Sequence, residues 1–566
     1  MITTPARLLT NAELARRLVE LAQMLRAKGE NPFKVRAYRR AAETVGGLEE
    51  SVDALVRAGE DLTRFPGIGK GIAAALREIV FSGKLGQLEL LLSAAPPEVA
   101  ALNEYPRLDP QRVARVYKKL KISNVGELRE KFESGEIATA FGQRIEEHFR
   151  QALRENHQIL LYDADEQAHR LRRHLLTKCE VSRAEVVGDV RRRVEVVGEL
   201  AFLIECDDLD ATVDRVKKFG GGIEVVDRTT ADATFQLPGS VMLTLHRATA
   251  QQWGLLLIAT TGSPAHLEEL EKAKGPLARW GRTKRGHADE AAAYKAMKLA
   301  WIPPELREGR GEVKLAAREA LPALAEIGDI RGELHAHSTG SDGAHSIEEM
   351  AEAAKAKGYE YLGITDHSQS LKIARGVSVA DLRAQLRRID KLNARLSGIR
   401  ILKSAEVDIL ADGSLDYPDE LLAELDYTIC SIHSRFRLGK QEQTERILRA
   451  MDHPAFTILG HATGRKLLTR PGYEIDFERI VAHAKAAGCF FEINASPERL
   501  DLSVENARLA AEAGIKIAVC TDAHHSGELD YLSYGIDVAR RAGLEKSAIL
   551  NTRSWAKLRR LLKRKR

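Results

Sequence analysis

From residue 329 to about 550, short apolar runs alternate with segments that have a helical pattern. The runs include YLGIT, YTICSIHS, CFFEINA and IKIAVCTD, and SIEEMAEAAKAKG is one of the helical segments between them. Short apolar strands that alternate with helices are typical of parallel sheets, because parallel strands need a crossover connection. This alternation predicts a parallel α/β barrel or sheet, and it leaves the number of strands open.

Imidazoles and carboxylates gather at the ends of these expected strands, where barrel folds place their active sites. The nine donors are His335, His337, Asp342, His367, Glu406, His433, His461, Asp522 and His524. His335 and His337 in LHAHS lie two residues apart on an extended segment, so both rings point to the same face. Nine donors are too many for one ion, and two or three divalent ions that share a carboxylate fit the number.

A cluster of divalent ions can polarise a phosphate and generate a hydroxide nucleophile, which predicts phosphoester hydrolysis. A single histidine at a strand end is more often a hydrogen-bonded core residue, but a core gives no reason to collect ionisable side chains at successive strand ends. The residues expected to act catalytically, through bound metals, are His335, His337, Glu406, His433 and Asp522. Their neighbours Asp366, Asp408, Asn494 and Arg465 are interpreted as residues that support the ligands or contact substrate.

Residues 331 to about 545 resemble the PHP (polymerase and histidinol phosphatase) family, through the pattern HxH, SDG, TDH, a strand-terminal Glu, SxHS, GH and TDAH. The resemblance implies a distorted seven-stranded (β/α)7 barrel with a trinuclear centre, and competent residues occupy all nine ligand positions. It implies Mn²⁺ as the working ion, and an imidazole-rich site also suits Zn²⁺.

Near the N-terminus, LTRFPGIGKGIAAALREI (62–79) has the pattern of a helix-hairpin-helix motif. Gly67 and Gly69 let backbone amides approach a phosphate, and Lys70 and the helix N-terminus add positive charge. Such a hairpin binds the DNA backbone without reading the base sequence. Mere punctuation between two helices is the other interpretation of a lone GxG turn.

The upstream segment NPFKVRAYRRAAETV resembles the small N-terminal domain of family X DNA polymerases, which places Lys34 and Tyr38 near a 5′-phosphate. The residues assigned to DNA binding are Lys34, Tyr38, Gly67, Gly69, Lys70 and Lys84. Ala75 stands where lyase-competent relatives carry a Schiff-base lysine, so we expect no deoxyribose-phosphate lyase activity by that route. A second hairpin, EYPRLDPQRVARVYKKLKI, has Arg107 and Asp109 in place of the turn glycines, which puts its phosphate contact in doubt.

The run GDVRRRVEVVGELAFLI (188–204) resembles the palm of family X polymerases, and IPPELREGRGE (302–312) resembles the end of their polymerase module. Of the three expected catalytic aspartates, the first is Glu199, the second Ala201 and the third Met242. The serine expected at the triphosphate is Asp189. The resemblance leaves Gly188, Arg192, Gly262 and Ser263 as a vestigial nucleotide site, with Glu199 as a catalytic remnant.

Nucleotidyl transfer needs about three carboxylates to hold two Mg²⁺ ions. Mg²⁺ in this polymerase site is therefore doubtful, and we expect polymerisation to be weak or absent. A metal site rebuilt from Asp189 and Glu195 remains an alternative.

These patterns predict a multidomain α/β chain that combines a helical front, a nucleotidyltransferase-like α+β palm with a thumb, and the PHP barrel. The expected domains are 1–90 (N-terminal helix-hairpin-helix domain), 91–158 (second, fingers-like hairpin region), 159–248 (palm), 249–314 (thumb), 315–328 (linker) and 329–566 (PHP phosphoesterase).

Composition limits the partners and the compartment. No apolar run approaches the roughly 18 to 20 residues that a membrane helix needs, and the N-terminus lacks a signal pattern, which favours the cytoplasm and excludes a membrane role. The five cysteines are never spaced CxxC, so neither disulfides nor a thiolate zinc site is expected. The net charge of +5 is small for the length, but RSWAKLRRLLKRKR (553–566) is a basic end that either attracts phosphate or is simply frayed and solvated.

We expect a monomeric DNA-repair enzyme that binds gapped DNA and hydrolyses 3′ ends as a Mn²⁺-dependent 3′–5′ exonuclease. Two other functions remain open: an active gap-filling polymerase for which the PHP domain proofreads, and a non-catalytic repair scaffold. Small-molecule phosphatase chemistry is disfavoured by the DNA-binding front, although the expected metal site permits it.

Overall fold

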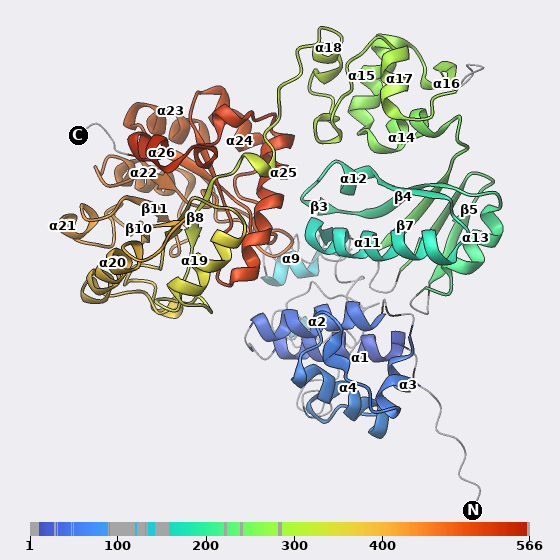
Figure 1. Cartoon of the computed structure of the whole chain (residues 1–566), viewed down its shortest axis with the longest axis horizontal. Helices are drawn as coiled ribbons and strands as arrows, with labels where there is room; N and C mark the ends of the chain where they lie inside the picture. The colour runs from blue at the N-terminus through green and yellow to red at the C-terminus, as the bar shows by residue number, and fades with distance from the viewer. Residues whose placement is uncertain are drawn as a thin grey trace, which may run out of the picture. The chain divides into compact units, whose positions relative to one another are not determined.

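The computed structural model of the chain (Figure 1) describes residues 9, 11–27, 30, 32–46, 48, 50–88, 90, 119–120, 131, 134–141, 158–219, 223–237, 241–280 and 286–562. The chain divides into two compact units. The first consists of Met1–Ile159, Asp165–Val187 and Gly198–Ala250, and the second of Leu160–Ala164, Gly188–Val197 and Gln251–Arg566. Most of the expected region 91–158, including Arg107 and Asp109 of the second hairpin, lies outside the described residues. The expected domain bounds remain predictions.

The front of the first unit is a set of short helices around one apolar core. They are α1 (Asn11–Ala27), α2 (Pro32–Gly46), α3 (Val52–Arg57), the 3-10 helix η1 (Leu62–Arg64) and α4 (Lys70–Ser82), and α9 (Glu136–Phe141) follows later in the chain. Leu14, Leu18, Val45 and Leu76 are fully buried in this core, as the three- and four-residue spacing of apolar residues predicts. The PGIG turn joins η1 to α4, which is the expected hairpin.

The rest of the first unit contains a five-stranded sheet with the order β2-β4-β7-β6-β5. The strands are β2 (Arg183–Val187), β4 (Glu199–Glu205), β5 (Glu224–Arg228), β6 (Asp232–Gln236) and β7 (Met242–Arg247). The helices of this stretch are α11 (Leu161–Lys178), whose first residues belong to the second unit, and α13 (Leu209–Val216). β4 and β7 pair in parallel, and the other neighbours are antiparallel. This is the α+β layer expected for the palm.

The longest segment of the second unit, Gln251–Arg566, begins with a group of helices. It contains α14 (Trp253–Thr261), α15 (Pro264–Lys274), α16 (Leu277–Trp280), α17 (Glu290–Ala296) and α18 (Glu312–Ala316), and the same unit includes α12 (Gly188–Arg191) and β3 (Val196–Val197). The carboxylate oxygen Oε1 of buried Glu290 lies 2.7 Å from Arg191 Nη1 and 2.5 Å from Nη1 of the fully buried Arg307. Two guanidinium groups compensate the burial of this carboxylate, so it ties the segment 302–312 to α12 and α17.

A barrel of seven parallel strands in the order β14-β13-β12-β11-β10-β9-β8 makes up the rest of the second unit. The strands are β8 (Gly332–Ala336), β9 (Tyr361–Ile364), β10 (Arg400–Asp408), β11 (Tyr427–Ser431), β12 (Ile458–Leu459), β13 (Phe490–Asn494) and β14 (Ile517–Cys520). The first and last strands meet where the His337 amide donates to the Ala523 carbonyl at 2.8 Å. The parallel α/β barrel is therefore confirmed, and the open number of strands is seven.

Helices surround these strands in Figure 1. They are α19 (Ile347–Ala356), α20 (Val379–Asn393), α21 (Asp419–Leu422), α22 (Lys440–Met451), α23 (Phe477–Ala487), α24 (Val504–Glu512), α25 (Leu532–Arg541) and α26 (Trp555–Leu562). In α26, Leu558 and Leu562 pack in a buried cluster with strand residues such as Leu334 and Ile458. The interpretation of the basic C-terminus as a frayed end is therefore wrong for residues 555–562, whose apolar side chains hold a helix against the strands, and residues 563–566 lie outside the described residues.

Gly363 shows how closely the interior of the barrel is packed. A Cβ at Gly363 on β9 would lie 1.8 Å from the hydroxyl oxygen of Tyr427 on β11. That hydroxyl donates to the carbonyl of Leu334 on β8, so one buried side chain links three strands. All five cysteines are buried and none of them forms a disulfide. No helix among the described residues is long and apolar enough to cross a membrane.

Candidate metal centre at the strand ends of the barrel

The nine expected donors converge at the carboxyl ends of the barrel strands. His335 is on β8, Glu406 is on β10, and His337, Asp342, His367, His433, His461, Asp522 and His524 follow β8, β9, β11, β12 and β14. The ligand atoms of eight of these donors, all except His461, form three overlapping groups, each with its atoms within 4.8 Å of one another. The groups are His337, Asp342, His367 and His524; His335, His337, Glu406 and Asp522; and His367, Glu406 and His433.

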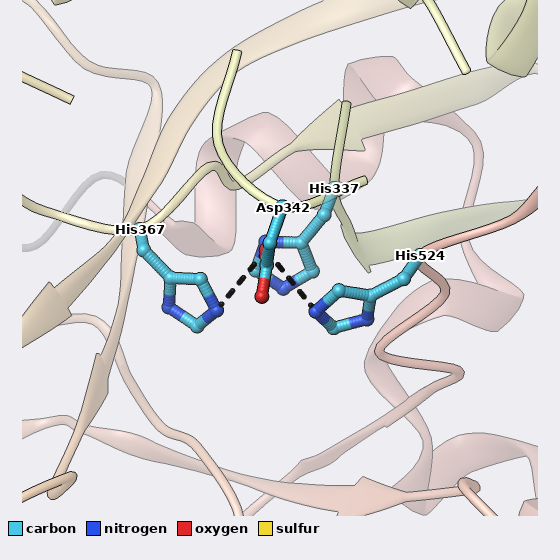
Figure 2. Close-up of side chains that lie close together, drawn as sticks. All are labelled: His337, Asp342, His367 and His524. Atoms are coloured by element: carbon cyan, nitrogen blue, oxygen red, sulfur yellow. Dashed lines mark ion pairs between the residues drawn. The ribbon is translucent and has the colours of Figure 1, made fainter. Parts of the chain in front are cut away.

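The first group is drawn in Figure 2, where His367 and His524 lie on either side of Asp342. Asp342 Oδ1 is 3.6 Å from His367 Nε2 and 3.3 Å from His524 Nε2. The carboxylate comes from the SDG turn after β8, while the two imidazoles come from the ends of β9 and β14. Three segments that are far apart in the sequence thus supply the ligand atoms of this group.

Glu406 lies at the centre of the whole cluster. Its Oε2 is 2.8 Å from His367 Nδ1 and 3.5 Å from His335 Nε2. Its Oε1 is 2.9 Å from His461 Nε2 and 3.4 Å from His433 Nε2. One fully buried carboxylate therefore faces imidazoles on both of its oxygens, as a carboxylate shared by two ions must.

Oxygen atoms outside the cluster hold three of the imidazoles through their Nδ1 atoms. His335 Nδ1 is 2.6 Å from Glu492 Oε1, His433 Nδ1 is 2.6 Å from Asp408 Oδ1, and His524 Nδ1 is 2.8 Å from the Asp522 carbonyl. A proton held on Nδ1 by an oxygen leaves the lone pair of Nε2 available for a cation. Asp408 therefore has the supporting position that the sequence suggested.

Several buried atoms of the cluster have no hydrogen-bond partner among the described residues, including His335 Nε2, Glu406 Oε2 and His461 Nδ1. Unpaired buried polar atoms are costly, and they are rare in folded proteins. Divalent cations would supply the missing partners, and a set of imidazoles and carboxylates suits Mn²⁺, Fe²⁺ or Zn²⁺. The residues present thus fit a metal centre.

Electrostatics in the cluster also favour cations. Burial alone raises carboxyl pKa values, but the surrounding histidines hold the pKa of Glu406 and that of Asp522 well below their usual range. Burial, together with His524 and His367, lowers the pKa of His337 to about 4, so this imidazole is neutral at pH 7. Despite burial, neighbouring carboxylates raise the pKa of His433 to about 10 and that of His524 to about 9. Metal binding must displace protons from these two rings.

Three residues beside the cluster were missed at the level of sequence. Glu492 on β13 holds His335, and Arg499 Nε lies 3.6 Å from Asp522 Oδ2. Glu333 on β8 is fully buried and accepts from the amide of His335 at 2.8 Å, and burial raises its pKa to about 7. The glutamates had a usable signal, because each is an acid inside an apolar strand (GELHA and CFFEINA). Arg499 had none, since it lies in a loop.

The other neighbours of the ligands have separate outcomes. Asn494 Nδ2 donates to Asp522 Oδ2 at 3.1 Å, and Asp366 accepts from the Ser338 amide at 2.7 Å, so both support the cluster. Arg465 donates to the carbonyls of Arg499 and Leu500, and no contact between it and a ligand is found among the described residues, so its contact with substrate stays a prediction. Arg465 is close to the ligand His461 in the sequence, but its side chain reaches the loop that contains Arg499 and Leu500.

The three positions where the family resemblance expects polymerase carboxylates lie on adjacent strands, and Glu199 is the one acid among them. Glu199 on β4 pairs in register with Met242 on β7, and Ala201 pairs with Thr244. The Thr244 hydroxyl donates to the Glu199 carboxylate. A methyl group and a thioether thus occupy the places of two carboxylates.

The alternative metal site at Asp189 and Glu195 is not supported by the contacts of these residues. Asp189 Oδ1 is 2.5 Å from Arg192 Nη2. Glu195 accepts from Arg541 at 2.9 Å and from Arg465 at 3.3 Å, all within the second unit. Guanidinium groups therefore pair with both carboxylates.

The expected nucleotide residues lie in the second unit. Arg192 donates to the Thr261 carbonyl at 2.7 Å and pairs with Glu308 at 3.2 Å, while Gly188 begins α12 with φ 62°. Gly262 directly follows α14, and the buried Ser263 hydroxyl accepts from the His266 amide as the N-cap of α15. These contacts give the residues structural roles that need no nucleotide.

Four of the expected DNA-binding residues of the front, Gly67, Gly69, Lys70 and Lys84, lie on α4 or next to one of its ends. Gly67 has φ 83°, Gly69 is the N-cap of α4, and Lys70 is the first residue of that helix. Lys84 follows α4 and is exposed, as are Lys70 and Gly71 at the start of the helix. A surface hollow is lined by Gly67, Gly69, Pro66, Arg64 and Ala37.

Lys34 and Tyr38 are both on α2 and differ in exposure. The Lys34 side chain is 40% exposed and lies 3.6 Å from Glu30, whereas Tyr38 is buried in the apolar core. Ala75 is also buried, so no amine stands at the lyase position.

Comparisons with known proteins agree with this architecture. Residues 9–85 match the family model of the helix-hairpin-helix domain, and residues 333–496 match that of the PHP domain. The chain is 34% identical over 572 residues to the "DNA polymerase/3'-5' exonuclease PolX" of Bacillus subtilis, covering 98% of this chain and 99% of that protein.

Shorter proteins resemble part of the chain. It is 32% identical over 231 residues to a "probable phosphatase" of Thermoanaerobacter pseudethanolicus, covering 39% of this chain and 89% of that protein. It is 30% identical over 232 residues to a "probable phosphatase" of Acetivibrio thermocellus, covering 39% of this chain and 90% of that protein. From the order of its domains and its similarity over nearly the whole length to the Bacillus protein, the chain belongs to the bacterial family X DNA polymerases with a C-terminal PHP domain.

Proposed function

We propose that the PHP centre hydrolyses phosphodiesters at the 3′ ends of DNA and that Mn²⁺ is its working ion. The observation that carries this proposal is the convergence of eight nitrogen and oxygen donors in three overlapping groups, two of which share the buried Glu406, with His461 as a further imidazole beside that carboxylate. Bound divalent ions would polarise the phosphate and lower the pKa of a coordinated water. The similarity to a protein named as a 3'-5' exonuclease favours a DNA end over a small phosphomonoester.

The chain's own residues have distinct tasks in this proposal. Glu406, Asp342 and Asp522 would hold the ions with the six histidines, while Glu492 and Asp408 keep His335 and His433 in the tautomer that binds them. Removal of His433 or Asp522 therefore removes a ligand without removing an apolar core side chain.

We propose that the front half holds the DNA and contributes little or no polymerisation. The hairpin at Gly67 and Gly69 offers backbone amides to a phosphate, which suits a gapped duplex bound without regard to sequence. In the palm, Glu199 alone cannot replace the roughly three carboxylates that two Mg²⁺ ions need. The protein would act as a monomer, which size-exclusion chromatography with light scattering can test.

The test is one gel assay with gapped DNA labelled at either end, with Mn²⁺, with and without nucleotides. The expected result is shortening from the 3′ end that disappears in His433→Ala and in Asp522→Ala. Shortening that persists in both variants would place the activity in a contaminant or at another site.

The same gel decides between this proposal and the alternatives. Template-directed extension that is lost in Glu199→Ala would establish a gap-filling polymerase with a PHP proofreading centre. Binding of gapped DNA with neither shortening nor extension would establish a scaffold.

A further inference from the structure

Three basic side chains lie together beside the metal centre and are not among its ligands. Lys466 and Arg470 come from the loop after β12, and Arg499 comes from the loop after β13. Arg499 Nε lies 3.6 Å from Asp522 Oδ2, and the side chain is 15% exposed. Its Nη1 is buried without a hydrogen-bond partner among the described residues. A buried guanidinium nitrogen without an acceptor is costly, so this nitrogen points to a missing anion.

Backbone contacts hold the two loops against each other. The Leu467 amide donates to the Glu498 carbonyl at 2.7 Å, and Arg465 Nε donates to the Arg499 carbonyl at 3.0 Å. Arg470 donates to the Gly464 carbonyl at 2.7 Å, and its guanidinium lies 4.5 Å from the centre of the Phe436 ring. The cationic groups therefore have fixed positions, which a phosphate site requires.

The acidic side chains beside these three cationic groups do not fully neutralise their positive charge. Lys466 pairs with Glu498 at 3.4 Å, and Arg499 shares Asp522 with the ligand cluster. Burial lowers the pKa of Lys466, and so do the nearby charges of Arg499 and Arg470, against the opposing effect of Glu498. Burial and Arg499 also lower the pKa of Arg470. Each cation thus destabilises the others, and an anion among them would relieve this repulsion.

We propose that Lys466, Arg470 and Arg499 form a second phosphate site, which binds the backbone phosphate next to the scissile phosphodiester of a DNA strand. The inference rests on the proposed function, because the metal centre must hold the scissile phosphate. A small phosphomonoester has no second phosphate, so the site would select a polynucleotide over a single phosphate. Arg and Lys are the side chains that proteins use to neutralise backbone phosphates. The Lys466 side chain is 40% exposed, so a strand can reach it from solvent.

The experiment compares two substrates of the full-length protein with Mn²⁺. One is a single-stranded oligothymidylate of about ten nucleotides, and the other is thymidine 5′-(p-nitrophenyl phosphate), which offers one phosphodiester and no neighbouring phosphate. The variants are Lys466→Met, Arg470→Met and the double variant. Arg499 is left in place because it contacts Asp522, and Lys485→Met, an exposed lysine of α23, is the matched control.

The double variant should raise KM for the oligonucleotide at least tenfold and change kcat/KM for the mononucleotide substrate less than threefold. The slope of log KM against log salt concentration should fall by about 0.7, the value for one phosphate contact on a single strand. Lys466→Arg should restore most of the affinity, and Lys485→Met should behave as wild type.

Equal losses on both substrates, or an unchanged KM for the oligonucleotide, would overturn the second phosphate site while leaving the proposed function in place. Failure of the wild-type protein to hydrolyse either substrate would instead reject the proposed function. Should the double variant unfold, the single variant Lys466→Gln gives the same comparison, because this lysine is partly exposed.

Discussion

Glu492 offers the sharpest test of how the metal centre is held together, because it touches a ligand without being one of the clustered donors. Its Oε1 lies 2.6 Å from His335 Nδ1, and its Oε2 accepts from the His461 amide at 2.7 Å. The change Glu492→Gln keeps the size of the side chain. If the amide oxygen keeps the bond to the His461 amide, the amide nitrogen faces His335 Nδ1 and donates a hydrogen bond to it. The ring must then carry its own proton on Nε2, where a metal would bind.

The magnitude follows from the general effect of losing the partner of a metal-bound histidine. Such changes typically weaken metal affinity by about 10- to 100-fold. This corresponds to about 1.4 to 2.7 kcal/mol of binding free energy. The fold itself should tolerate the change, because Glu492→Gln leaves no cavity in the strand.

Manganese binding is measured by isothermal titration calorimetry and by the loss of the free Mn²⁺ signal in electron paramagnetic resonance. The expected result is weaker binding of at least one ion, together with exonuclease activity that higher Mn²⁺ concentrations restore. Glu478→Gln, at an exposed position on α23, is the matched control and should bind Mn²⁺ as the wild type does.

Two outcomes would refute this reasoning. Unchanged Mn²⁺ affinity in Glu492→Gln would mean that His335 does not depend on this carboxylate for its orientation. Activity that stays lost at saturating Mn²⁺, in a protein with normal affinity, would give Glu492 a role in the chemistry and not in holding the metal.

Three further predictions concern stability in the second unit, each measured by urea unfolding. Glu195→Gln, which removes a carboxylate from between its two arginines, should cost about 1 to 3 kcal/mol, and an unchanged midpoint would show that these ion pairs contribute nothing. Burial alone would raise the pKa of Glu290, but its two arginines hold it at about 2, below the ordinary 4.5, so the ionised carboxylate stabilises the fold above pH 4.5 and this contribution is lost as pH falls toward 2. Glu290→Gln should therefore cost about 3 kcal/mol at pH 7 and about half of that at pH 3, and a difference independent of pH would contradict the assignment. Gly363→Ala places a methyl group against Tyr427 and should cost about 3 kcal/mol, whereas Gly328→Ala, which meets nothing within 4 Å, should be neutral.

Much of the metal centre could be predicted because its residues occupy defined places in a regular pattern. All strands of a parallel barrel end at the same face. Histidines and carboxylates at the ends of the apolar runs therefore come close together. This is why His335, Glu406, His433 and Asp522 could be placed together although they are separated by up to 187 residues, the difference between positions 335 and 522. The palm strands could likewise be compared with the family pattern residue by residue, and the strand register places Met242 beside Glu199.

Two of the residues that were missed or misjudged lie outside that pattern. Arg499 and Arg465 are in loops, where the direction of a side chain depends on the neighbouring loop and not on periodicity. Long flexible side chains reach partners that are distant in sequence, as Arg465 does with Glu195. Glu492 follows the strand pattern, but only the fold shows that its partner is His335.

The sequence alone predicted the fold class, the helix-hairpin-helix front and the candidate donors of the barrel, because these follow from residue types, their spacing and the motifs they form. The tertiary structure decided which donors share a group, that Glu406 lies at their centre, and which outer oxygens set the histidine tautomers. Those properties depend on distances of a few ångströms between separate strands and loops. Only packing of the whole barrel fixes such distances.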